Sequence, residues 1–105
     1  MRFNEEKNIQ EALEYIKSTY GEHYAARQDK HQLMDEIIEA GDDLAFNRWN
    51  AEKYIRRFGK KGGYNRKDLL KAIHYVVLMM YYHDRLQPET GISSTDRYKS
   101  ELLTG

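Results

Sequence analysis

The chain has no cysteine and only one proline among its 105 residues. Without cysteine it can form neither disulfides nor thiolate metal sites, as is typical of proteins in a reducing cytoplasm. Because its single proline is Pro88, the sequence before that position is free to form long helices. Alternation of apolar and polar residues, the usual mark of a strand, is also missing over any useful length. These absences predict an all-α protein.

Long apolar runs are scarce as well. The longest nearly apolar run, residues 72–82, has 11 residues, whereas a membrane helix needs roughly 20. The first ten residues contain no apolar signal core. The sequence therefore predicts a soluble protein that is not exported and has no membrane partner.

Apolar residues recur at helical spacing in four parts of the chain. With 40% hydrophobic and 12% aromatic residues, a chain of this length is expected to fold as one domain over residues 1–105. We expect a small bundle of four main helices, near residues 4–20, 33–40, 46–58 and 65–86, with residues 22–30 as a polar link. The third and fourth form a hairpin across the glycine-containing loop 59–64. A short C-terminal helix is expected to end near residue 103.

The helix expected over residues 65–86 is apolar on more than one side, so it needs neighbours all round. A chain this small has few helices with which to cover it. The sequence therefore predicts a homo-oligomer.

The net charge is zero, but the charges are segregated. Residues 1–51 carry a balance of minus 5, residues 52–71 one of plus 6 and residues 72–105 one of minus 1. A helical hairpin would bring the cations of the middle segment together at its loop, beside the backbone amides that begin the next helix. We expect a phosphate site there, formed by Lys53, Arg57, Lys60, Lys61, Lys67 and Lys71.

Other readings of these charges stay open. The cations could form a solvated face that is paired with the acidic residues before them. A nucleic acid would use the same cations, with Tyr54, Tyr64 and Tyr75 as stacking platforms, but the neutral chain and its acidic first half favour a compact nucleotide over a long polyanion. Tyr54 and Tyr75 therefore join the candidate ligand contacts, together with Asn50.

The stretch WNAEKYIRRFGKKGGYNRKDLLKAIHY, residues 49–75, resembles the signature of a small phage domain family of long-unknown function. The matching residues are Asn50, Lys53, Tyr54, Arg57, Gly59, Lys60, Lys61, Gly62, Asp68, Leu69, Lys71, Ala72 and Tyr75. Upstream, His23 and Tyr24 stand for the family's His-Tyr pair. Both are candidate ligand contacts, His23 for a phosphate or base and Tyr24 for stacking on a base. The similarity spans about residues 22–83. Trp49 occupies the place of a family glycine.

The resemblance implies a phage-encoded protein in the cytoplasm of the infected cell. The same domain occurs in a phage nucleotide kinase that phosphorylates nucleoside monophosphates, so a nucleoside monophosphate kinase is one expectation for this chain. The chain has no Gly-x-x-x-x-Gly-Lys-Ser/Thr phosphate loop, so such an activity would be unconventional. A non-catalytic protein that sequesters or senses a host signalling nucleotide is the second expectation, and a protein-binding phage factor is the third.

Acidic residues supply a candidate cation site. Asp35 and Glu39 are four residues apart on one expected helical face and could hold Mg²⁺ that is bound to a nucleotide. Glu36 and Glu39 also satisfy the first half of the motif pattern of all-α nucleotide pyrophosphohydrolases, but the helix expected over residues 46–58 has no matching acidic pair. Solvent-facing carboxylates that balance the basic segment are the alternative.

Overall fold

The computed structural model describes residues 2–21, 24–60 and 62–86, with the backbone alone for residues 24–31. It contains four helices: α1 (Glu5–Gly21), α2 (Tyr24–Ala40), α3 (Asp43–Arg57) and α4 (Arg66–Leu86). The all-α prediction and the four main helices are confirmed. The short C-terminal helix expected near residue 103 lies outside the described residues.

Helix α2 corrects the sequence prediction. It begins at Tyr24 rather than near Leu33, so most of the segment expected to be a polar link is helical. The first part of α2, YAARQDKH (residues 24–31), has little apolar periodicity but is rich in alanine, arginine, glutamine and lysine. These residues lose little freedom in a helix, so intrinsic propensity explains the earlier start.

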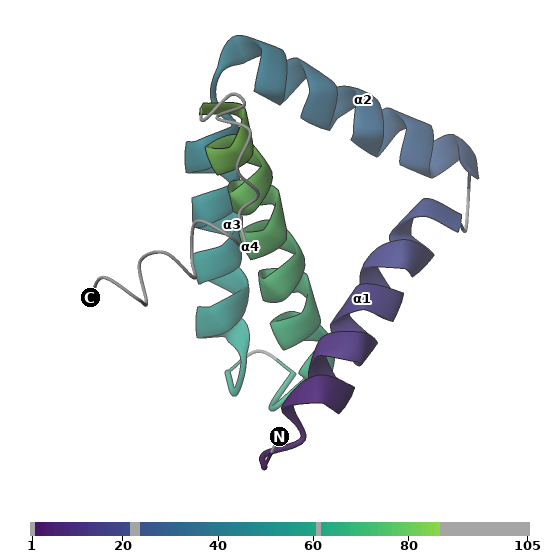
Figure 1. Ribbon diagram of the computed structural model, residues 1–105, viewed down its shortest axis with the longest axis vertical. Coiled ribbons are helices and arrows are strands. Elements are labelled where there is room, and N and C mark those ends of the chain that lie inside the picture. The colour runs from purple at the N-terminus through teal and green to yellow at the C-terminus, as the bar shows by residue number, and fades with distance from the viewer. Residues whose placement is uncertain (1, 22–23, 61, 87–105) are drawn as a thin grey trace, which may run out of the picture.

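Helices α3 and α4 form the predicted antiparallel hairpin and lie side by side along most of their length (Figure 1). Ala51 and Ala72 are buried where the helices meet. Four polar residues are buried on the same two helices: Asp43, Asn47, Asn50 and Asp68. In the described part of the chain the only fully buried apolar side chains are alanines, Ala12 of α1 being the third. The hairpin is therefore held closely, but around a small and partly polar interior.

The turn between α3 and α4 is closed by backbone hydrogen bonds. The amide of Gly59 donates to the carbonyl of Gly63 over 3.0 Å, and the Lys60 amide donates to the carbonyl of Arg57 over 2.9 Å. Gly59 has a φ of +87°, which glycine adopts without the steric cost that a Cβ would add. The ring of Tyr64 packs over Gly59 and meets Phe58 edge to face. The chain can thus reverse within a few residues.

Ion pairs join the two helices at both ends of the hairpin. A nitrogen of Arg85 lies 2.7 Å from an oxygen of Asp43, and Nε of Arg57 lies 3.9 Å from an oxygen of Asp68. Each carboxylate lies in the first turn of its helix, where the helix dipole favours negative charge. Each arginine lies in the last turn of the other helix. Polar pairs at the two ends therefore help to fix how α3 and α4 align.

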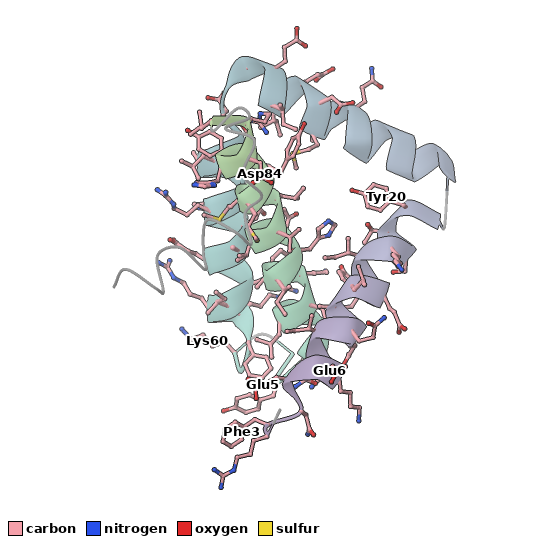
Figure 2. All side chains as sticks on the ribbon, viewed as in Figure 1. Phe3, Glu5, Glu6, Tyr20, Lys60 and Asp84 are labelled. Atoms are coloured by element: carbon pink, nitrogen blue, oxygen red, sulfur yellow. The ribbon has the colours of Figure 1, made fainter. Side chains whose placement is uncertain are left out.

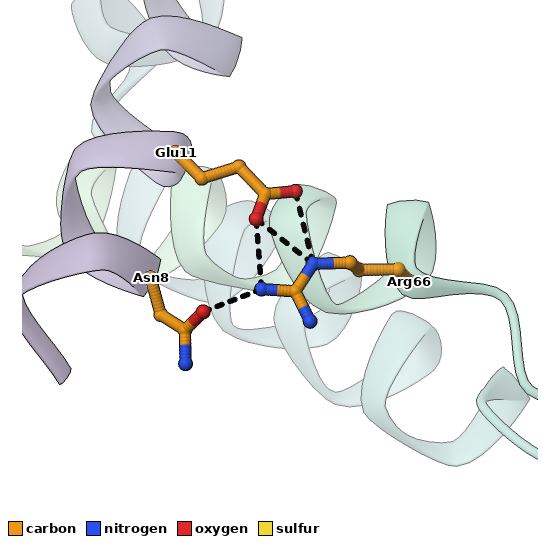
Figure 3. Close-up of polar contacts among 3 residues, drawn as sticks. All are labelled: Asn8, Glu11 and Arg66. Carbon is orange, nitrogen blue, oxygen red and sulfur yellow. Dashed lines mark hydrogen bonds and ion pairs between the residues drawn. The ribbon is translucent and has the colours of Figure 1, made fainter. Parts of the chain in front are cut away.

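Helix α1 is attached to the beginning of α4 through Arg66. The guanidinium of Arg66 contacts both carboxylate oxygens of Glu11 at 2.7–2.9 Å and donates to Oδ1 of Asn8 over 2.6 Å (Figure 3). From this end the two helices diverge, and α2 crosses between the far end of α1 and the start of α3 (Figure 1). No helix in the described ranges is long and apolar enough to cross a membrane.

Candidate functional site

The ring of Tyr54 is the point at which cations from the two hairpin helices meet. Nζ of Lys53, the preceding residue on α3, lies 4.7 Å from the ring centroid. Nζ of Lys71, from α4, lies 5.0 Å from the same centroid. Because each ammonium group is attracted to the negative charge of the aromatic face, one ring holds both side chains in place. Two of the six predicted phosphate contacts are therefore brought together.

Tyr54 is itself supported by a second tyrosine. The rings of Tyr54 and Tyr75 are stacked, with centroids 5.9 Å apart and planes inclined by 7°. Phe46 packs against Tyr75 edge to face at 6.2 Å. Burial raises the pKa of the Tyr75 phenol, and the neighbouring phenols of Tyr54 and Tyr15 raise it further. Tyr75 thus remains neutral at physiological pH and acts as a rigid backing for Tyr54.

Trp49 extends this arrangement to the surface. It lies one helical turn before Lys53, and Nζ of Lys53 is 5.3 Å from the indole centroid. The indole is 63% exposed, so most of a large aromatic surface is open to solvent beside the cation. Sequence reasoning treated Trp49 only as a replacement for glycine. The four-residue spacing from Trp49 to Lys53 was the signal that could have found this contact.

Neither Lys53 nor Lys71 has a carboxylate within 4.0 Å among the residues that the structure describes. Both side chains are half-buried, so their charges are less well solvated than those of fully exposed lysines. Two like charges near one ring also repel each other. An anion that contacted both ammonium groups would relieve that repulsion.

Arg57 lies at the hairpin end, 3.9 Å from the carboxylate of Asp68. The side chain of Asp68 is 6% exposed, whereas that of Arg57 is 46% exposed. The arginine therefore neutralises a buried carboxylate and still presents part of its guanidinium to solvent. Within the described residues, Arg57 has a carboxylate partner and Lys53 and Lys71 have none.

Two other predicted cations, Lys60 and Lys67, flank the hairpin turn. Lys60 and Lys67 are exposed, and Lys60 lies at the hairpin turn (Figure 2). The side chain of Asn65 accepts from the amide of Lys67 over 2.9 Å, and its carbonyl accepts from the amide of Asp68 over 3.0 Å. These two amides at the start of α4 are thus already hydrogen-bonded. Lys61 lies outside the described residues.

The remaining candidates are placed as follows. Asn50 is buried, and its side-chain amide donates to the carbonyl of Phe46 over 2.9 Å, so it ties one turn of α3 to the next.

The two carboxylates of the candidate cation site, Asp35 and Glu39, are exposed on α2. Within the described chain no group of three or more His, Asp or Glu side chains is placed to hold a metal ion. His23 and the side chain of Tyr24 lie outside the described structure.

Sequence reasoning missed the polar residues that line the hairpin. Asp43, Asn47 and Asp68 each bury a side-chain oxygen that has no hydrogen-bond partner among the described residues, and Nη1 of Arg85 also has none there. The positions of the charged residues at the helix ends were the signal in the sequence that could have indicated these pairs. Each hairpin helix has an acidic residue in its first turn and an arginine in its last turn, and an antiparallel hairpin brings the first turn of one helix beside the last turn of the other.

Comparison with known proteins finds no family pattern that the chain matches, no similar curated protein and no similar solved structure.

Proposed function

We propose that the corner formed by Trp49, Lys53, Tyr54 and Lys71 binds the phosphate and base of a small nucleotide. The observation that carries this proposal is that two ammonium groups from different helices converge on the Tyr54 ring without a carboxylate partner in the described structure. A phosphate oxyanion matches that charge and supplies several hydrogen-bond acceptors. We refer to these four residues as the lysine corner.

The aromatic part of the lysine corner favours a nucleotide over inorganic phosphate. The exposed indole of Trp49 offers a flat surface for a base, and base stacking on an aromatic side chain contributes about 1–3 kcal/mol. Its position beside Lys53 lets one ligand use both the ring and the ammonium group. Arg57 lies one helical turn from Lys53 on α3, and exposed Lys67 lies one turn from Lys71 on α4, so both are candidates for contact with a second phosphate. The resemblance to the phage domain family supports a nucleoside monophosphate as the first ligand to test.

We propose that the lysine corner binds a nucleotide without catalysing phosphoryl transfer. Phosphoryl transfer depends on positioning and charge neutralisation, to which lysines contribute. The two lysines of the lysine corner can bind a phosphate, but none of its four residues is a carboxylate that could act as a base. Sequestration or sensing of a nucleotide therefore fits the site better than the kinase activity that the family resemblance implies.

The test uses the single tryptophan of the chain, because Trp49 reports directly on the site. Purified protein is titrated with a nucleoside monophosphate, the matching nucleoside and inorganic phosphate, and binding is followed by indole fluorescence and by calorimetry. We expect the nucleotide to bind more tightly than either fragment. Equal affinity for the nucleoside and the nucleotide would contradict a role for the lysines.

Variants locate the site. Lys53→Ala and Lys71→Ala should each weaken nucleotide binding by about tenfold or more, because a hydrogen bond to a charged group contributes about 1.5–3 kcal/mol. Lys17→Ala, which removes an exposed lysine from α1, is the matched control and should bind as the wild type does. Calorimetry is needed for Lys53→Ala because the substitution itself alters the surroundings of Trp49. Chromatography of the nucleotide after incubation with ATP and Mg²⁺ separates binding from phosphoryl transfer.

A further inference from the structure

A group of eight large apolar side chains is exposed along α1 and α4 and, apart from Trp49 of the lysine corner, at Ile55 of α3. They are Ile9, Leu13 and Tyr20 on α1, Ile73, Val76, Val77 and Met80 on α4, and Ile55 on α3, and each is between 41% and 67% exposed. We call these eight residues the apolar face. Figure 2 shows Tyr20 pointing from the end of α1 toward α4. An apolar surface of this extent is unusual on a soluble monomer.

Helical geometry places these residues on one side of the molecule. On α4, Asp68, Ala72 and Tyr75 are turned toward α3, and the stripe Ile73, Val76 and Met80 lies roughly a quarter turn from them. The hairpin is antiparallel, so the same rotational sense brings Ile55 of α3 to that side. Two helices of the hairpin therefore contribute to one surface.

Helix α1 continues the surface. It turns Asn8, Ala12 and Tyr15 toward α4, as the contacts of Asn8 with Arg66 and of Tyr15 with His74 show. Its own apolar stripe, which contains Ile9 and Leu13, lies about a quarter turn away. Because α1 and α4 run in the same direction, this rotation brings the stripe to the same side as that of α4 (Figure 1). Val77 lies between the two stripes.

We infer that the apolar face is the interface of a homodimer, in which the same face of a second copy covers it. Eight side chains of this size, at these exposed fractions, present roughly 800 Å², which is about what one partner contributes to a stable complex. The sequence predicts a homo-oligomer from the apolar character of α4, and the structure assigns the surface and the arrangement. A two-fold axis that passes close to Val76 lets each copy cover the other.

The distribution of charge sets the direction of the pairing. Helix α2 and the short link to α3 carry exposed Asp35, Glu36, Glu39 and Asp42 at one end of the molecule. At the opposite end, the hairpin turn and the start of α4 carry exposed Lys60 and Lys67, and Arg56 nearby is paired with Glu52 (Figure 1). Glu5 and Glu6 of α1 also lie at this end, where Arg2, Lys7 and Arg66 of the described chain keep the balance of charge positive (Figure 2). An antiparallel dimer places the acidic end of one copy over the basic end of the other. The parallel arrangement would place like charges together.

The lysine corner lies on the other side of the hairpin. Trp49 and Lys53 are rotated away from the α4-facing residues of α3 in the sense opposite to Ile55. Dimerisation through the apolar face therefore leaves the proposed nucleotide site open, and variants of one surface should not affect the other. Failure of the dimer and failure of the nucleotide site are thus distinguishable.

Sedimentation of the full chain tests the inference. We expect the wild type to sediment as a dimer at micromolar concentrations, and Val76→Glu and Met80→Glu to sediment as helical monomers. Phe3→Glu is the matched control, because Phe3 is 73% exposed but lies outside the apolar face, and it should remain a dimer. A wild type that is monomeric at 100 μM, or a dimer that both glutamate variants leave intact, would overturn the assignment.

Cross-linking tests the arrangement without depending on folding of the charged variants. Because the chain has no cysteine, single cysteines can be introduced without background. Under mild oxidation Val76→Cys should form an interchain disulfide rapidly, whereas Glu52→Cys, on the outer side of α3, should not. A mixture of Ile73→Cys and Met80→Cys should cross-link between the two variants faster than either alone. Rapid coupling of Glu52→Cys with none at Val76→Cys would contradict the proposed axis.

Discussion

The guanidinium of Arg85 lies 2.7 Å from a carboxylate oxygen of Asp43 and joins the last turn of α4 to the first turn of α3. The hydrogen bond to this carboxylate raises the pKa of Arg85. Asp43 is 1% exposed, so the ion pair with Arg85 offsets the cost of burying its carboxylate. Arg57 and Asp68 repeat the arrangement at the other end of the hairpin. Since the interior between these ends is small, the two pairs define the alignment of α3 and α4.

Loss of Arg85 should destabilise the hairpin more than loss of the whole pair. Arg85→Met leaves the carboxylate of Asp43 buried without a positive partner, which is costly, so the melting temperature should fall. The double variant Asp43→Leu/Arg85→Met removes both charges and should recover part of the loss. Thermal unfolding of the wild type, the two single variants and the double variant measures this coupling. Strictly additive effects would show that the two residues do not interact.

Gly59 tests the geometry of the turn. Alanine there would take a left-handed φ and place its Cβ 2.7 Å from a ring carbon of Tyr64, so the ring must move away from Phe58. We expect Gly59→Ala to lower the free energy of unfolding by about 1–2 kcal/mol. Gly62→Ala is the control, since its φ is also positive but its Cβ would meet open space, and it should cost less. The difference between the two variants should disappear when Tyr64 is replaced by alanine.

Ala72 tests the close approach of the hairpin helices. It is 4% exposed and faces α3, so a larger side chain must push the helices apart. Ala72→Leu should lower the free energy of unfolding by about 1–3 kcal/mol in chemical denaturation. Ala45→Leu, at an exposed position of α3, is the matched control and should change stability little. A neutral Ala72→Leu variant would mean that the interface has spare volume.

The pair of Glu11 and Arg66 predicts an acid-dependent attachment of α1. The hydrogen bond from Arg66 lowers the pKa of Glu11 below its ordinary value of about 4.3. A carboxyl group with a lowered pKa stabilises the fold above that ordinary value, and the contribution is lost as the pH falls through the lowered pKa. The melting temperatures of the wild type and Glu11→Gln should therefore differ at neutral pH and approach each other in acid. A constant difference from pH 7 to pH 2 would exclude the ion pair as its source.

The sequence predicts the fold well where apolar periodicity and glycine agree. The ranges of α1, α3 and α4 follow from that periodicity, and the hairpin follows from the glycines between residues 59 and 63. The first half of α2 could not be found in this way because propensity, rather than an apolar stripe, makes it helical. Apolar periodicity identifies helices that pack along their length against other helices. It does not identify a helix such as the first half of α2, which only connects two others.

The candidate site could be predicted from the sequence only in part, for a different reason. The spacing of Lys53 and Lys71 from the turn places them at corresponding levels of a hairpin, so their approach to Tyr54 could be anticipated. The partner of Arg57 could not, because a sequence does not show that Asp68 is buried and needs a cation. The exposure of Trp49 likewise depends on which side of α3 is covered by α4. Which cation is neutralised and which is available is decided by packing.

Site-resolved NMR of the lysine side chains during titration with a nucleoside monophosphate tests the central proposal most directly. If the lysine corner is one binding site, the terminal methylene signals of Lys53 and Lys71 should shift together along a single binding curve. Those of Lys7 and Lys17 on α1 should not move. Equal small shifts at all lysines, or a curve for Lys53 that differs from that for Lys71, would contradict the account.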